Sequence, residues 1–92
     1  MPESETGAEL DRLLKHLHGH PEDAAGHFRA GWLLGQGDRF PEALEHLRPA
    51  VSGDPENPLA WYYLAIAAAR SGDRQAAREG TEQFARLAPE DA

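Results

Sequence analysis

Three histidines, His16, His18 and His20, alternate along a short segment and are the first candidates for chemistry, because imidazole nitrogens are common metal ligands. On a helix, however, only residues three or four positions apart share a face. Gly19 and Pro21 interrupt a helix before His20, so the three rings need not converge. We expect no carboxylate or thiol nearby to complete a ligand set. The histidines are interpreted as solvated residues at a helix end, and no metal site is predicted.

Three glycines, Gly31, Gly35 and Gly37, superficially suggest a phosphate-binding loop. Phosphate-binding glycines follow a strand and precede the amino terminus of a helix, whereas these lie along and at the end of an expected helix. Packing and helix termination explain them instead. Catalysis has less support still, because the chain has no cysteine and no pair of carboxylates falls in an expected cleft. The chain is predicted to be neither an enzyme nor a cofactor-binding protein.

Charge and hydropathy exclude further classes of partner. The 92 residues carry a formal net charge of −7, which opposes binding to nucleic acid and to acidic membrane surfaces. No apolar run is long enough to span a bilayer, and the residues before Leu10 lack the basic and apolar segments of a signal peptide. We therefore expect a soluble, cytoplasmic, single-domain protein.

The sequence repeats itself at a fixed interval. Residues 21–23, 55–57 and 89–91 read Pro-Glu-Asp, Pro-Glu-Asn and Pro-Glu-Asp, and Ala43 and Ala77 are separated by the same interval. A fixed period of this length is typical of stacked repeats, each of which forms one supersecondary unit.

Apolar residues at spacings of three and four predict five helices between the turn residues. Their expected ranges are residues 6–18, 24–36, 41–52, 58–71 and 74–88. The connections are only a few residues long, which forces consecutive helices to lie antiparallel.

Local signals predict where these helices begin and end. Asp23, Asn57 and Asp73 are expected to cap the helices that follow them, and Thr6 with Glu9 fits a capping box. Glycine can adopt the left-handed conformation that closes a helix. The glycines expected at helix ends are Gly19, Gly37, Gly53 and Gly72. Because Gly37 comes one residue earlier in its unit than Gly72, the first hairpin turn should be longer by about one residue.

A helix-turn-helix unit of about 34 residues resembles the tetratricopeptide repeat, whose pattern runs W-x2-L-G-x2-Y, then A-x3-F, then P. Residues 56–89 match this pattern at Trp61, Leu64, Ala77 and Pro89, and depart from it at Ala65, Ala68 and Thr81. Residues 22–55 match at Gly31, Ala43 and Pro55, and depart at His27, Ala30, Leu34 and Leu47. Residues 6–21 would be a partial unit that holds only the second helix.

The resemblance implies one all-α domain over residues 1–92, a right-handed solenoid of helical hairpins. The first helix of each unit would line a concave surface, and Trp61 would point between the helices of its own hairpin. The expected partner-binding residues on the concave surface are Phe28, Arg29, Trp32, Leu59, Tyr62, Tyr63, Ile66 and Arg70, with Ala25 beside them.

Two functions fit this expectation. The first is a non-catalytic scaffold that binds a protein or peptide segment on its concave aromatic surface, because exposed aromatic and arginine side chains are typical of interfaces. The family's clamp of Lys, Arg and Asn is lacking, so we expect an apolar ligand segment with a carboxylate near Arg29 and Arg70. The second is a self-associating protein whose repeats pair into a homo-oligomer. In a third interpretation, the aromatic rings simply pack in the core between the hairpins.

Overall fold

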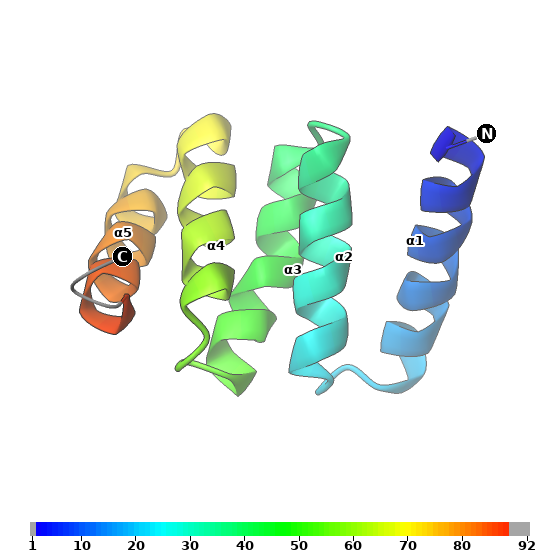
Figure 1. Ribbon diagram of the computed structural model, residues 1–92, viewed down its shortest axis with the longest axis horizontal. Helices are drawn as coiled ribbons and strands as arrows, with labels where there is room; N and C mark the ends of the chain where they lie inside the picture. The colour runs from blue at the N-terminus through cyan, green and yellow to red at the C-terminus, as the bar shows by residue number, and fades with distance from the viewer. Residues whose placement is uncertain (1, 89–92) are drawn as a thin grey trace.

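The computed structural model describes residues 2–88 and the side chains of residues 6–88. The described residues form five helices and no strand: α1 (Pro2–Gly19), α2 (Ala24–Gln36), α3 (Phe40–Gly53), α4 (Pro58–Ser71) and α5 (Arg74–Leu87). Figure 1 shows them side by side along the long axis of the molecule, with α3 behind α2 and α4. The prediction of an all-α stack of helical hairpins is confirmed.

Packing follows the order of the chain. Helix α2 pairs with α3 and α4 pairs with α5, and these two hairpins join where α3 contacts α4 and where α2 meets α4. Among the described helices, α1 packs against α2 alone. None of the described helices combines the length and the hydropathy needed to cross a membrane.

The core lies between the helices of the two hairpins. Leu34, Leu47 and Leu64 are the largest side chains that are fully buried, and Ala30 and Ala43 are buried beside them. Short side chains at these points allow the helix axes to approach each other closely. Ala30 and Ala43 therefore serve close packing in the first hairpin.

Glycines mark close approaches between the helices of both hairpins. A Cβ atom added to Gly31 would lie 2.6 Å from the Cγ atom of Leu47, so α2 and α3 can meet there only because residue 31 has no side chain. A Cβ atom added to Gly80 would lie 2.9 Å from the carbonyl oxygen of Trp61. Sequence analysis identified Gly31 but not Gly80, because the repeat pattern asks for no glycine at that point.

The starts of α2, α4 and α5 agree with prediction. The carboxylate of Asp23 accepts the backbone N–H of Gly26 at 3.0 Å, and that of Asp73 accepts the N–H of Ala76 at 3.0 Å. The side-chain oxygen of Asn57 accepts the N–H of the second residue of α4 at 3.1 Å. These contacts satisfy amides that have no partner within the helix.

The predicted start of α1 at Thr6 is wrong. The helix begins at Pro2, so Thr6 lies within it and does not cap it. Proline is well tolerated at the first helical position, because its missing N–H would have no partner there anyway. The capping-box pattern was therefore overridden by a start that is equally compatible with the local sequence.

The two hairpin turns have the same backbone hydrogen bonds at equivalent positions of the two repeats. The N–H of Arg39 donates to the carbonyl of Leu34, and the N–H of Asp73 donates to the carbonyl of Ala68, both at 2.9 Å. By the helix bounds the first connection has one residue more, residues 37–39 against residues 72–73, although the hydrogen-bonded turn spans the same number of residues in both hairpins.

The left-handed residue differs from expectation in the first turn. In the second turn it is Gly72, with a φ of 83°, whereas in the first it is Asp38, with a φ of 60°. Gly37 has a φ of −94°, and Gly19 and Gly53 are the last residues of their helices. Asp38 stands one repeat interval before Gly72. The position within the repeat, and not the presence of a glycine, therefore decides which residue adopts the left-handed conformation.

Replacing Asp38 by glycine is expected to raise the free energy of unfolding by about 0.5–1 kcal/mol. In the left-handed region a non-glycine residue is less stable than glycine by about 1–2 kcal/mol, so glycine should stabilise the folded state. The greater conformational freedom of glycine in the unfolded chain offsets part of this stabilisation. Urea unfolding followed by circular dichroism measures the change. The matched variant Gly72→Ala should lower stability by about 1 kcal/mol. A loss of stability in Asp38→Gly would contradict the assigned turn.

Candidate functional site

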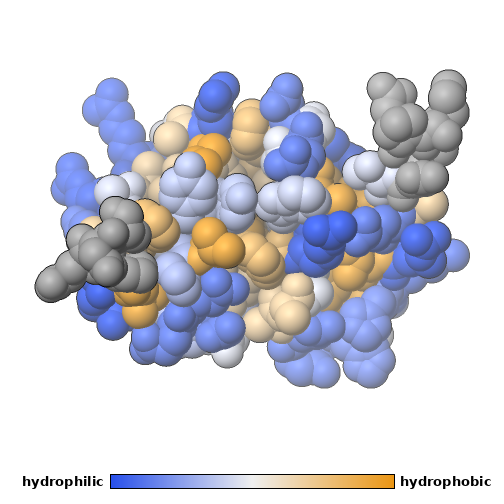
Figure 2. Space-filling view, in the orientation of Figure 1, coloured by the Kyte–Doolittle hydropathy of each residue, from blue (hydrophilic) through white to orange (hydrophobic). Residues whose placement is uncertain are grey.

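The predicted partner-binding residues come together on one face of the molecule. Phe28, Arg29 and Trp32 lie on α2, and the other five lie on α4 at spacings of one to four residues. Figure 2 shows hydrophobic surface in the middle of this face, where α2 and α4 lie in Figure 1, with hydrophilic side chains around it. The face combines residues from both hairpins.

Burial divides these residues into two groups. Among the side chains that the structure describes, the exposed large hydrophobic residues are Leu59 and Tyr62, at 51% and 42%. Phe28, Trp32 and Tyr63 are partly buried and pack against the core. The rings of the second group are therefore held in place by the core and still reach solvent. One part of each ring packs in the core, and the other part is open to a partner.

A row of aromatic rings crosses from α2 to α5. The ring centroids of Phe28 and Tyr63 are 6.1 Å apart, those of Tyr63 and Tyr62 are 5.2 Å apart, and those of Tyr62 and Phe84 are 5.3 Å apart. Aromatic pairs at such distances attract each other through their edges and faces. Phe84 was not among the predicted site residues, because its helical spacing indicated only the apolar stripe of its own helix.

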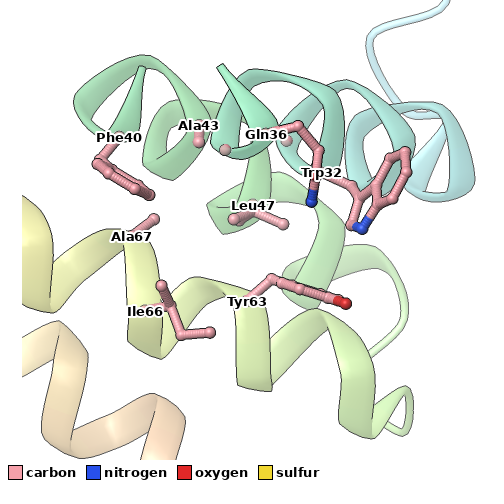
Figure 3. Close-up of a pocket in the computed structure, with 10 residues that line it drawn as sticks. Trp32, Gln36, Phe40, Ala43, Leu47, Tyr63, Ile66 and Ala67 are labelled. Carbon is pink, nitrogen blue, oxygen red and sulfur yellow. The ribbon is translucent and has the colours of Figure 1, made fainter. Parts of the chain in front are cut away.

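A cavity of about 200 Å³ opens beside this row, between α2, α3 and α4. In Figure 3, Trp32 and Tyr63 lie at one end, Phe40 and Ile66 lie at the other, and Leu47 lies between them. We call this space the α2–α4 pocket. The residues that line it are Gly31, Trp32, Gly35, Gln36, Phe40, Ala43, Leu47, Tyr63, Ile66 and Ala67.

The pocket includes residues that were not among the predicted site residues. The ring of Phe40 forms one end of it. Phe40 lies three, four and seven residues before Ala43, Leu44 and Leu47, so its place in the apolar stripe of α3 was the signal that could have found it. Leu47 and Ala43 contribute to the pocket because they lie behind the gap between α2 and α4.

The two arginines on this face have different partners. Arg29 donates from Nε and Nη2 to the two carboxylate oxygens of Glu9, at 2.7 and 3.0 Å, and its guanidinium lies 4.6 Å from the ring centroid of Trp32. These hydrogen bonds lower the pKa of Glu9 and raise that of Arg29. The guanidinium of Arg70 lies 5.4 Å from the ring centroid of Phe40, and no carboxylate among the described residues forms an ion pair with it. Of the two, Arg70 therefore remains available to a ligand carboxylate.

Charge is distributed unevenly between this face and the rest of the chain. The sequence contains 16 acidic residues, yet neither α2 nor α4 carries one. Arg29 and Arg70 are the charged side chains of these two helices. In a chain whose net charge is −7, the face formed by α2 and α4 is apolar and locally cationic.

Two carboxylates lie beside the alternating histidines. The chain turns back after α1, which brings Oδ2 of Asp23 to 2.8 Å from Nε2 of His16 and Oε1 of Glu22 to 3.8 Å from Nδ1 of His20. The rings of His16 and His20 stack with centroids 4.7 Å apart. Over the part of the chain that the structure describes, no group of three such side chains could hold a metal ion.

A family model for the tetratricopeptide repeat matches residues 33–92, from the last turn of α2 onward, which is well over half of the chain. No curated protein matches the chain. The matched segment contains α3, α4 and α5 and most of the residues that line the α2–α4 pocket.

Proposed function

The chain belongs to the tetratricopeptide-repeat family, and from this premise we propose that its α2–α4 pocket and the adjoining aromatic row bind an apolar segment of a partner protein. Repeats of this family generally mediate contacts between proteins and generally have no enzymatic role. In this proposal the chain is a non-catalytic scaffold. Its units are the partial repeat at residues 6–21 and the two full repeats at residues 22–55 and 56–89.

The observation that carries the proposal is the α2–α4 pocket itself. An apolar cavity of about 200 Å³ that opens between aromatic rings suits a leucine, isoleucine or phenylalanine side chain from a partner. Trp32 and Tyr63 are partly buried against the core, so their rings are already positioned before a ligand arrives. A pre-organised site loses less conformational entropy on binding.

The charges beside the pocket define the rest of the ligand. Arg70 lies over Phe40, one of the rings that line the pocket, and it has no carboxylate partner among the described residues. A ligand with an apolar residue followed by a carboxylate would place the apolar side chain in the pocket and the carboxylate on Arg70. Arg29 is less suitable, because Glu9 already occupies its guanidinium.

Replacing Trp32 by alanine is expected to weaken binding of a selected peptide by at least about 30-fold, the size of an interface hot spot. The peptide would come from a random-sequence display library selected on the wild-type protein, and calorimetry would measure its affinity. Helicity should change little, because the ring is partly exposed. Arg78→Ala, on the exposed side of α5, is the matched control and should bind like the wild type.

Two outcomes would contradict this proposal. Selected peptides that bind Trp32→Ala as tightly as the wild type would place the site elsewhere. Strong unfolding of Trp32→Ala would assign the ring to the core, where truncation of a tryptophan costs about 3–5 kcal/mol.

Self-association is the second candidate, and the exposure of Leu59 and Tyr62 favours it. Both side chains lie on α4 and leave apolar surface open to solvent. A second copy could cover them, as happens at symmetric dimer interfaces. Sedimentation velocity over a range of protein concentrations distinguishes the two candidates, since a monomer at all concentrations is incompatible with a homo-oligomer.

A further inference from the structure

A buried histidine replaces a tryptophan between the two repeats. His27 stands one repeat interval before Trp61, and both are buried, with His27 only 9% exposed. The indole N–H of Trp61 donates to the carbonyl oxygen of Pro55 at 2.8 Å. Nε2 of His27 lies 2.8 Å from the carbonyl oxygen of Pro21, the equivalent residue of the preceding turn. The same anchor is thus made in both repeats, but only in the first by a side chain that can take up a proton.

The second nitrogen of His27 faces another imidazole. Nδ1 of His27 lies 3.1 Å from Nδ1 of His46 on α3. A carbonyl oxygen can only accept, so Nε2 of His27 must carry a hydrogen, and in the neutral ring Nδ1 is then an acceptor. His46 must therefore donate from its own Nδ1. The neutral pair therefore has one hydrogen between the two Nδ1 atoms, which is enough for one hydrogen bond.

We propose that His27 and His46 form a proton-sensitive joint that holds α2 against α3 near neutral pH and weakens in acid. Protonation of His46 at Nε2 puts a positive charge in a partly buried site beside His27, which weakens the joint although the hydrogen bond between the rings can remain. A second proton, on His27, would break that hydrogen bond, because two N–H groups and two positive charges would then face each other at 3.1 Å. None of the described carboxylates is buried, so no buried negative charge offsets two positively charged rings. The second proton can therefore bind only if the rings move apart.

Charged groups from three helices surround the joint. Burial and the nearby His27 lower the pKa of His46, and Glu45 and Glu42 on α3 oppose this without reversing it. On the α2 side Asp23 faces His27, and the pKa of Asp23 is lowered, first by the backbone N–H of Gly26 and then by His16 of α1. Asp23 therefore stays ionised over the range in which His46 titrates.

The sign of the stability change follows from the direction of the His46 shift. In the unfolded chain His46 titrates near its ordinary pKa of 6.5, and in the folded protein it titrates lower. The unfolded state therefore binds more protons between these two values. The stabilisation is complete above pH 6.5 and is lost as the pH falls from 6.5 through the pKa of the folded state. Each unit of difference corresponds to about a tenfold change in the folding equilibrium constant.

The joint is connected to the α2–α4 pocket. His27 and Gly31 are four residues apart on the same face of α2, and Leu47, which follows His46, packs against Gly31 at the back of the pocket. A separation of α2 from α3 would disturb this contact. The loss of stability in acid stands on its own, whereas an accompanying loss of ligand binding rests on the proposed function.

The test compares urea unfolding of the free protein at about pH 7.5 and about pH 5, on either side of the histidine titration. The wild type should lose more of its folding equilibrium constant between these two pH values than His46→Gln, which keeps a donor for His27 but does not titrate. His18→Gln is the matched control, because His18 is exposed on α1, and it should behave as the wild type does. No ligand is used, so a failed binding site cannot affect the result.

Two results would overturn the proposal. One is an equal acid loss in the wild type and in His46→Gln. The other comes from the histidine resonances of the wild type, which remain informative if the variant does not fold. In those spectra, His46 should titrate below 6.5, and titration at or above 6.5 would show that the pair does not resist protonation.

Discussion

Replacing Leu47 by alanine is expected to lower the free energy of unfolding by about 2–5 kcal/mol. The side chain is 1% exposed and packs against Gly31 at the point where α2 and α3 are closest. Its removal loses apolar burial and leaves a cavity that rigid helices cannot fill. A chain of 92 residues has a stability of about 5–14 kcal/mol, so this one side chain accounts for a large part of it. Urea unfolding by circular dichroism at neutral pH measures the loss.

Leu59→Ala is the matched control for this experiment. It removes the same atoms from a side chain that is 51% exposed on α4. Substitutions at such surface positions usually change stability by no more than about 0.5 kcal/mol. Equal losses in the two variants would show that Leu47 is not part of the core.

Replacing Gly80 by alanine is expected to lower stability by up to about 2 kcal/mol, because forcing atoms into a packed interior costs about 1–3 kcal/mol and the higher helix propensity of alanine offsets about 1 kcal/mol of this cost. The new Cβ atom would lie 2.9 Å from the carbonyl oxygen of Trp61 and 2.9 Å from the Cβ atom of Ala65. Neither neighbour is the end of a flexible side chain, so α4 and α5 must move apart. This packing cost should exceed the gain of about 1 kcal/mol that alanine has over glycine inside a helix.

Gly35→Ala isolates that gain. Gly35 is also helical, and a Cβ atom added to it meets no atom within 4 Å. This variant should be more stable than the wild type by about 0.5–1 kcal/mol under the same unfolding conditions. If Gly80→Ala were stabilised as well, the close approach of α4 to α5 would be refuted.

Local chemistry explains why so much of the fold was predictable. Helices α2 and α4 have the bounds that the sequence predicts, because a capping residue stands before each one. Asp23 caps α2 directly, and Asn57 precedes a proline that fits only a first turn. Where two local signals compete, as Pro2 and Thr6 do in α1, the sequence does not decide between them.

The candidate site was predictable only in part, because helical spacing says which residues share a face but not what lies opposite. Spacing placed Trp32 and Ile66 on the α2–α4 face correctly. It could not show that Arg29 is held by Glu9 of a different helix, or that Phe40 lies opposite Trp32 in the pocket. Contacts between helices depend on how far apart their axes lie, which Gly31 and Gly80 determine.

The packing of each helix against its neighbours in the chain also bears on how the protein is made. Each hairpin joins its two helices through a connection of three or two residues, and closing a short loop loses little entropy. Topologies dominated by such local contacts fold quickly. During synthesis, α2 and α3 can pair before α4 and α5 have left the ribosome, and the second hairpin then adds to a surface that already exists.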